Sequence, residues 1–88
     1  MKIIVTETNA DTQDYVLNGR LSHKETLEFS TKEDARAYVK ARYEKVCESF
    51  VKGHGIKEKS YYHDVKYGTC YAMVLSDKYI WDACVYLL

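Results

Sequence analysis

The sequence predicts an α+β fold, a small two-layer sandwich in which one amphipathic helix at about 31–52 covers one face of an antiparallel sheet of 4–5 strands. Three observations predict it. Runs of β-branched and aromatic residues lie near both ends of the chain, a helical repeat of apolar residues lies between them, and a capping motif precedes that repeat. The 88 residues contain no proline, repeat or low-complexity tract, so we expect a single domain over residues 1–88, with the order β-β-(β)-α-β-β.

The first strand is expected at residues 2–8, where Ile3 and Val5 point to one side and their neighbours Ile4 and Thr6 to the other. Further along, the Asn18-Gly19 dipeptide is the strongest short hairpin signal in the chain, because both central positions of a type I′ turn need positive φ. We therefore expect a small hairpin that joins the short apolar segments on either side of this dipeptide.

A third strand is expected at residues 23–29, where apolar and polar residues alternate, with Leu27 and Phe29 on the apolar side. The helix should follow at once, because Ser30 and Glu33 have the spacing of a capping box. At 100° per residue, its apolar residues fall within one arc of about 120°. These residues are Ala35, Val39, Tyr43, Val46, Cys47 and Phe50. Glycines at 53 and 55 should end the helix.

The segment 69–88 is the longest run of strand-forming and apolar residues, and we interpret it as a β-hairpin with its loop at 76–78. This loop length places three apolar pairs on the face that packs against the core, namely Leu75 with Tyr79, Met73 with Trp81 and Tyr71 with Ala83. The alternative is a helix that begins at Ser76 or Asp77, because the apolar residues that follow also fit helical spacing.

The other face of this hairpin is nearly as apolar as the first. It carries Cys70, Ala72, Val74, Ile80, Asp82, Cys84, Tyr86 and Leu88. A single helix covers only one face of a sheet, so this second face is expected either to lie beneath the N-terminal hairpin or the 53–62 segment, or to be a protein interface. For the interface hypothesis, the contact residues are Val74, Ile80, Asp82, Tyr86 and Leu88.

Residues 56–68 alternate in the manner of a strand, and Gly68 could form a bulge that continues this strand into the hairpin. The same segment combines basic and aromatic residues, which is the composition that single-stranded nucleic acid binding requires. Its candidate residues are Lys57, Lys59, Tyr61, Tyr62 and Lys66. Because the segment has a small net charge and no RNA-binding signature motif, nucleic acid binding is the alternative function.

Composition and spacing speak against several chemistries. Thirteen basic residues balance thirteen acidic ones, so no global field attracts nucleic acid or a membrane. The three cysteines and three histidines lack the paired spacings of a metal site, and Ser60, His63 and Asp64 lack the context of a catalytic triad. We therefore expect no enzyme, metal or cofactor. The odd number of cysteines and the absence of a leader or of a long apolar segment predict a cytoplasmic protein with reduced thiols.

Protein binding is the function that the sequence favours. The chain has nine tyrosines and one tryptophan, more than a core of this size absorbs, and these residue types anchor interfaces. We expect a non-catalytic domain that occupies the surface of another protein or of a second copy of itself, as a homodimer. By fold-level analogy alone, small α+β proteins without motifs include phage and mobile-element inhibitors of host defence, anti-CRISPR proteins among them.

Overall fold

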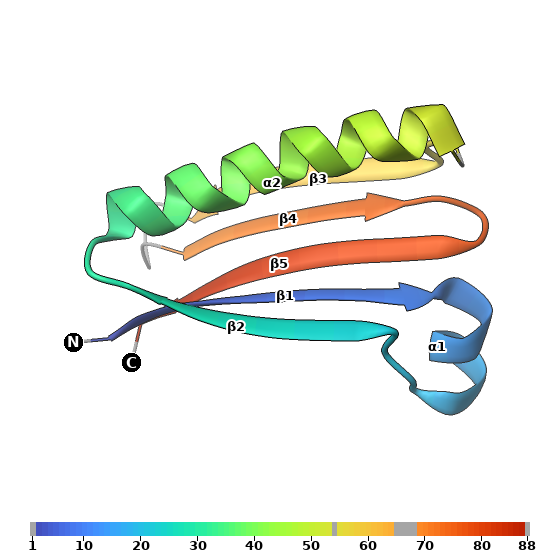
Figure 1. The fold of residues 1–88 in the computed structure, drawn as a ribbon, viewed down its shortest axis with the longest axis horizontal. Coiled ribbons are helices and arrows are strands. Elements are labelled where there is room, and N and C mark those ends of the chain that lie inside the picture. The colour runs from blue at the N-terminus through green and yellow to red at the C-terminus, as the bar shows by residue number, and fades with distance from the viewer. Residues whose placement is uncertain (1, 54, 65–68, 88) are drawn as a thin grey trace.

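The computed structural model describes residues 2–53, 55–64 and 69–87. Its elements are β1 (Ile3–Asp11), α1 (Thr12–Asn18), β2 (His23–Phe29), α2 (Lys32–Gly53), β3 (Glu58–Asp64), β4 (Thr69–Leu75) and β5 (Tyr79–Leu87). The five strands form one antiparallel sheet in the order β2-β1-β5-β4-β3. The long helix α2 runs along one face of this sheet (Figure 1). The predicted two-layer α+β sandwich is confirmed.

Strand β1 lies inside the sheet, between β2 and the C-terminal strand β5. It is longer than the expected segment of residues 2–8, because its pairing with β5 continues to Asp11, opposite Tyr79. Alternation along β1 follows the prediction, since Ile3 and Val5 are buried while Ile4 is only partly buried. Strand β2 coincides with the expected segment 23–29, and its Leu27 and Phe29 are its two partly buried residues.

The hairpin predicted at Asn18-Gly19 is wrong, because the segment before it forms the short helix α1. The Asp11 carboxylate caps this helix by accepting a hydrogen bond of 3.0 Å from the Asp14 amide. Gly19 ends it with φ of 66°, and its amide donates to the Tyr15 carbonyl at 2.8 Å. The positive φ that suggested a hairpin turn is equally what a helix C-terminus requires, so the local signal fits both structures.

Helix α2 begins within a residue of the expected position, but its cap is Thr31 rather than Ser30. The Thr31 hydroxyl accepts a hydrogen bond of 3.1 Å from the Asp34 amide. The predicted apolar arc faces the sheet and joins the core. The buried core consists of Ile3, Val5, Ala35, Val39, Val46, Ala72, Val74, Trp81, Ala83 and Val85.

Strands β4 and β5 form the predicted hairpin, so the alternative of a C-terminal helix is wrong. The predicted register is wrong by one residue, because Leu75 pairs with Ile80 and Val74 with Trp81. A serine turn causes the shift. The Ser76 amide donates to the Tyr79 carbonyl at 2.8 Å, and the Ser76 hydroxyl accepts from the Tyr79 amide at 2.9 Å. Only two residues therefore form the loop.

This register reverses the two faces of β4. Val74 and Ala72 lie beneath α2 and are fully buried, whereas Met73 and Leu75 lie on the other side and are partly buried. The placement of Val74 on an exposed second face is therefore wrong. The predicted bulge at Gly68 and the predicted contact residue Leu88 lie outside the described residues.

Candidate functional site

One face of the sheet lacks a covering helix along most of its length, and we call it the open face. Its described members alternate with the core residues along each strand. They are Lys24, Thr26 and Glu28 of β2, Ile4, Thr6 and Thr8 of β1, Ile80, Asp82, Cys84 and Tyr86 of β5, Met73 and Leu75 of β4, and Glu58 and Ser60 of β3. Apolar side chains of this set lie on the three inner strands and charged ones mainly on the two edge strands.

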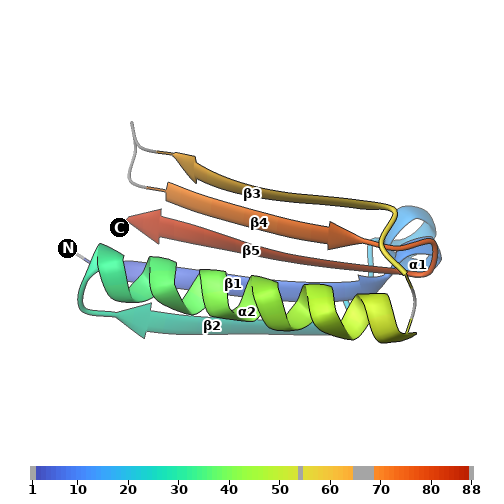
Figure 2. The same cartoon turned by 90° about the horizontal axis from the view of Figure 1, so that it is seen from above.

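Helix α1 lies on the open side of the sheet, at the end of β1 and opposite α2 (Figure 2). It reaches only one end of the face, where Ala10 is buried. The helix is itself apolar toward solvent, since the Val16 and Leu17 side chains are 74% and 70% exposed. The expectation that an N-terminal element folds over the second face thus holds for one end alone, and through a helix in place of a hairpin.

A hollow of about 340 Å³ lies where α1 meets the open face. Tyr15 and Leu21 form one wall, from α1 and the loop after it, and Ile80, Asp82 and Tyr86 belong to the opposite wall on β5. Tyr15 and Tyr86 are each 48% exposed. Two tyrosines and two aliphatic side chains around a concave surface are the residue types that anchor protein contacts.

The electrostatics of the open face are weakly acidic. Its described charges are three carboxylates, Glu28, Glu58 and Asp82, and the single ammonium group of Lys24. Asp82 is partly engaged, since it accepts a hydrogen bond of 2.6 Å from the Thr8 hydroxyl. The carboxylates on the open face therefore favour a cationic counterpart.

Two titratable groups on β5, the central strand of the sheet, stay neutral. Burial, together with the Asp82 carboxylate, raises the pKa of the Cys84 thiol. The hydrogen bond with Cys84 and the charge of a Cys84 thiolate, followed by burial, raise the pKa of the Tyr86 hydroxyl. Both shifts favour the protonated forms, so the face presents a thiol and a phenol, not anions, at neutral pH.

On the covered face, a polar cluster lies between α2 and the sheet around the buried Glu7 carboxylate. Glu7 is only 5% exposed, and one of its carboxylate oxygens accepts hydrogen bonds from Trp81 Nε1 at 2.7 Å and Arg42 Nε at 2.8 Å. The Tyr38 hydroxyl donates to the second oxygen at 3.3 Å. Burial raises the pKa of the Glu7 carboxyl, but the hydrogen bonds and the charge of Arg42 outweigh it, so this pKa lies below its ordinary value.

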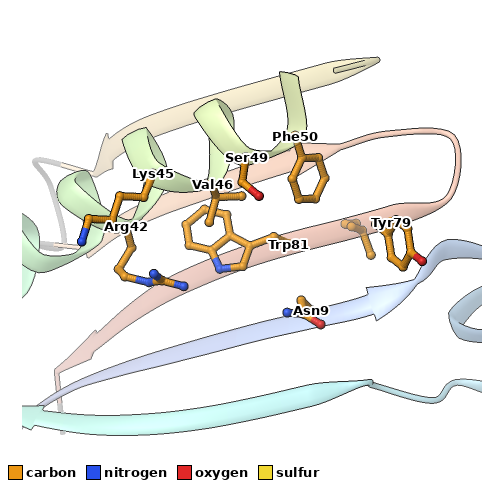
Figure 3. A pocket seen from close by; sticks show the side chains of 9 residues that line it. Asn9, Arg42, Lys45, Val46, Ser49, Phe50, Tyr79 and Trp81 are labelled. Atoms are coloured by element: carbon orange, nitrogen blue, oxygen red, sulfur yellow. The ribbon is translucent and has the colours of Figure 1, made fainter. Parts of the chain in front are cut away.

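A groove of about 460 Å³ opens beside this cluster, between the C-terminal half of α2 and the ends of β1 and β5 (Figure 3). The Arg42 side chain reaches down from α2 toward Asn9, and the Trp81 ring lies between α2 and β5. The Arg42 guanidinium group pairs with the Glu7 carboxylate, so this ion pair connects α2 to β1 beside the groove.

The open face brings together three of the predicted contact residues. Ile80, Asp82 and Tyr86 alternate along β5 and share the hollow beneath α1. Val74 lies on the opposite face, as described above. Sequence reasoning missed Met73 and Leu75, which the register places on the open face, and missed Tyr15 and Leu21 because the segment was expected to be a hairpin.

The structure describes the side chains of three of the residues predicted to bind nucleic acid, Lys57, Lys59 and Tyr61. Lys59 and Tyr61 lie on the α2 side of β3, opposite Val74 and Ala72, and the Tyr61 ring packs against Tyr43 with centroids 5.3 Å apart. The Lys57 ammonium group lies 3.8 Å from the Asp77 carboxylate, in the connection before β3. Tyr62 belongs to β3, and Lys66 lies outside the described residues.

Within the described residues, no group of three or more His, Cys, Asp or Glu side chains is placed to hold a metal ion. Over the same ranges, no helix combines the length and the apolar character that crossing a membrane requires. Ser60, His63 and Asp64 all belong to β3, and the side chains of His63 and Asp64 lie outside the described part of the structure.

Comparison with known proteins adds no assignment. No family model matches the chain, and neither the curated proteins nor the solved structures contain a match.

Proposed function

We propose that this protein is a non-catalytic binding domain whose open face docks on the surface of another protein. One observation carries the proposal. The sheet has one face whose inner strands are buried beneath a 22-residue helix, and a second face on which aliphatic and tyrosine side chains are only partly covered by a 7-residue helix. Monomeric proteins seldom leave an apolar surface of this extent uncovered unless it contacts a partner.

The size of the face fits a protein contact. The two longer dimensions of the molecule, 36 and 26 Å, enclose at most roughly 900 Å², which leaves room for the ~800 Å² that each partner contributes to a standard interface. The hollow beneath α1 adds a concave anchor site, with Tyr15 and Tyr86 as its aromatic walls. Ile80, which belongs to both the face and the hollow, is the aliphatic residue that we expect to lie at the centre of the contact.

The chemistry of the face defines the kind of partner. Apolar side chains lie on the inner strands and carboxylates outnumber ammonium groups around them, so the complementary surface is apolar at its centre and carries lysine or arginine at its rim. Such a partner inserts an apolar side chain into the hollow and pairs a basic residue with Asp82 or Glu58. Binding then requires no chemistry from this domain beyond shape and charge.

A peptide pair tests the proposal. One amphipathic peptide carries an apolar face flanked by lysines, and its matched counterpart carries glutamates at the same positions. We expect the basic peptide to shift the NMR signals of Ile4, Ile80 and Tyr86 and the acidic peptide to leave them unchanged. Equal binding of both peptides, or shifts confined to the α2 side, would contradict the proposal.

Substitutions on the face sharpen this test. Ile80→Asp and Tyr86→Ala should each weaken binding of the basic peptide by about 30-fold, the effect of removing an interface anchor, while the circular dichroism spectrum stays that of the wild type. Val51→Asp is the matched control, because Val51 is 65% exposed but lies on α2. A loss of binding in the Val51 variant, or full binding by both face variants, would rule out the open face as the site.

A further inference from the structure

The two edge strands of the sheet, β2 and β3, each pair with one neighbour only, β1 and β4 respectively. Figure 2 shows them as the outermost strands. The outward backbone amides and carbonyls of an edge strand form a template on which another strand can add. β2 is also well exposed, since five of its seven residues are exposed and two are partly buried. The β2 edge is therefore accessible to an added strand.

The charges of β2 are complementary to those of β2 in a second copy of the chain. In an antiparallel pair with Thr26 on the two-fold axis, Lys24 lies opposite Glu28 of the second copy, and Glu28 lies opposite Lys24 of the second copy. These three positions alternate along the strand and share the open face. The remaining positions pair Glu25 with Leu27 and His23 with Phe29. All seven residues are thus paired, with one opposite-charge pair on each side of the axis.

Neither charge forms an ion pair with another residue that the structure describes. The ion pairs of the described residues involve Glu7, His23, Glu25, Arg42, Glu48, Lys52, Lys57 and Asp77, and neither Lys24 nor Glu28 is among them. Both residues are exposed. Forming the intermolecular pairs therefore breaks no ion pair among residues 2–53, 55–64 and 69–87 whose side chains are described.

We propose that the protein self-associates through β2, and that two copies pair antiparallel about Thr26. The two five-stranded sheets then form one continuous ten-stranded sheet. A two-fold axis perpendicular to the sheet keeps both α2 helices on one side and joins the two open faces on the other. The proposal does not depend on the function assigned to the open face, because edge pairing uses backbone groups and rim charges, not the apolar centre of the face.

A charge exchange tests this arrangement. Light scattering coupled to size-exclusion chromatography, run over a dilution series, should show a dimer for the wild type. Glu28→Lys and Lys24→Glu each place like charges opposite one another at both ends of the strand pair, so each should weaken dimerisation by about 30-fold. The double variant K24E/E28K restores the two opposite-charge pairs and should return the dissociation constant to within about threefold of the wild type.

Two further variants make every outcome informative. Lys59→Glu alters an exposed charge on the other edge strand and should leave the dimer intact, whereas Ile80→Asp alters the open face and should also leave it intact. A monomeric wild type, single variants that dimerise like the wild type, or a double variant that stays dissociated would each overturn the proposal. A dimer lost only in the Ile80 variant would place self-association on the open face and overturn edge pairing.

Discussion

The two faces of the sheet each carry a helix, but the two helices differ in how much they bury against the sheet. α2 spans 22 residues and buries Ala35, Val39 and Val46 against the sheet, while α1 spans seven residues and has none buried. Both are capped in the same way, by a side-chain oxygen that accepts from an amide three residues later. The two helices therefore differ in their tertiary contacts and not in their local helix signals. The face beneath α2 contributes stability, whereas the open face remains available for contact with a partner.

The largest contrast is expected between two neighbouring residues of β4. Val74 is fully buried under α2, whereas Met73 lies on the open face. Val74→Lys should abolish folding, because an unpaired charge in the core costs several kcal/mol and domains of this size have about 5–10 kcal/mol of stability. Met73→Lys should change stability by about 1 kcal/mol or less. Urea unfolding measures both, and similar losses would show that the open face is part of the stabilising core.

The polar interactions of the two faces offer a second comparison. Glu7→Ala removes the acceptor for Trp81 and Arg42 and leaves the buried Trp81 indole N–H without its acceptor, so we expect a loss of about 2 kcal/mol. Asp82→Ala removes one half-buried hydrogen bond with Thr8 and should cost about 1 kcal/mol. The two values come from denaturant unfolding of matched variants. A larger loss of unfolding free energy for Asp82→Ala than for Glu7→Ala would contradict the claim that the covered face contributes more of the stability.

Acid should weaken the covered face through the same carboxylate. The pKa of Glu7 is lower in the folded protein than its ordinary value, so its contribution is fully present above the unfolded pKa and is lost as pH falls through the folded pKa. Unfolding midpoints measured from neutral to acidic pH should fall more steeply for the wild type than for Glu7→Gln. A Glu7→Gln variant with wild-type acid sensitivity would contradict this linkage.

The smallest effects concern the helix caps. Thr31→Ala should lower the free energy of unfolding by about 1 kcal/mol, because α2 is part of the cooperative core. Asp11→Ala removes the equivalent bond of α1 and should leave the midpoint nearly unchanged, while it speeds hydrogen exchange at the Asp14 amide. If both substitutions shift the midpoint equally, α1 unfolds together with the core. That result would contradict the claim that only α2 belongs to the cooperative core.

Sequence patterns predicted the fold class, the helical segment and strand β2, since each depends on a periodicity of several residues. They failed where a short signal has two structural meanings. Gly19 ends a helix with the same positive φ that a hairpin turn would need. The Ser76 hydroxyl shortens the hairpin loop by one residue, and that single residue moves Val74 into the core and Met73 out of it.

The candidate site was predictable in part for the same reason. Ile80, Asp82 and Tyr86 alternate along one strand and therefore share a face whatever the register. The contribution of α1 was not predictable, because nothing local places Tyr15 over β5. The cluster around Glu7 was also beyond sequence reasoning, since its members come from β1, α2 and β5 and meet only in the assembled sheet.

The position of β1 between β2 and β5 has a consequence for synthesis. The bond from Trp81 to Glu7 and the bond from Thr8 to Asp82 each join residues 74 positions apart. When β1 and β2 leave the ribosome, the strand that completes the centre of the sheet has not yet been made. Until β5 emerges, one side of β1 stays unpaired, so folding is expected to be slow and to occur after translation of this segment. In that interval the nascent chain exposes an apolar strand, and chaperones are expected to bind it.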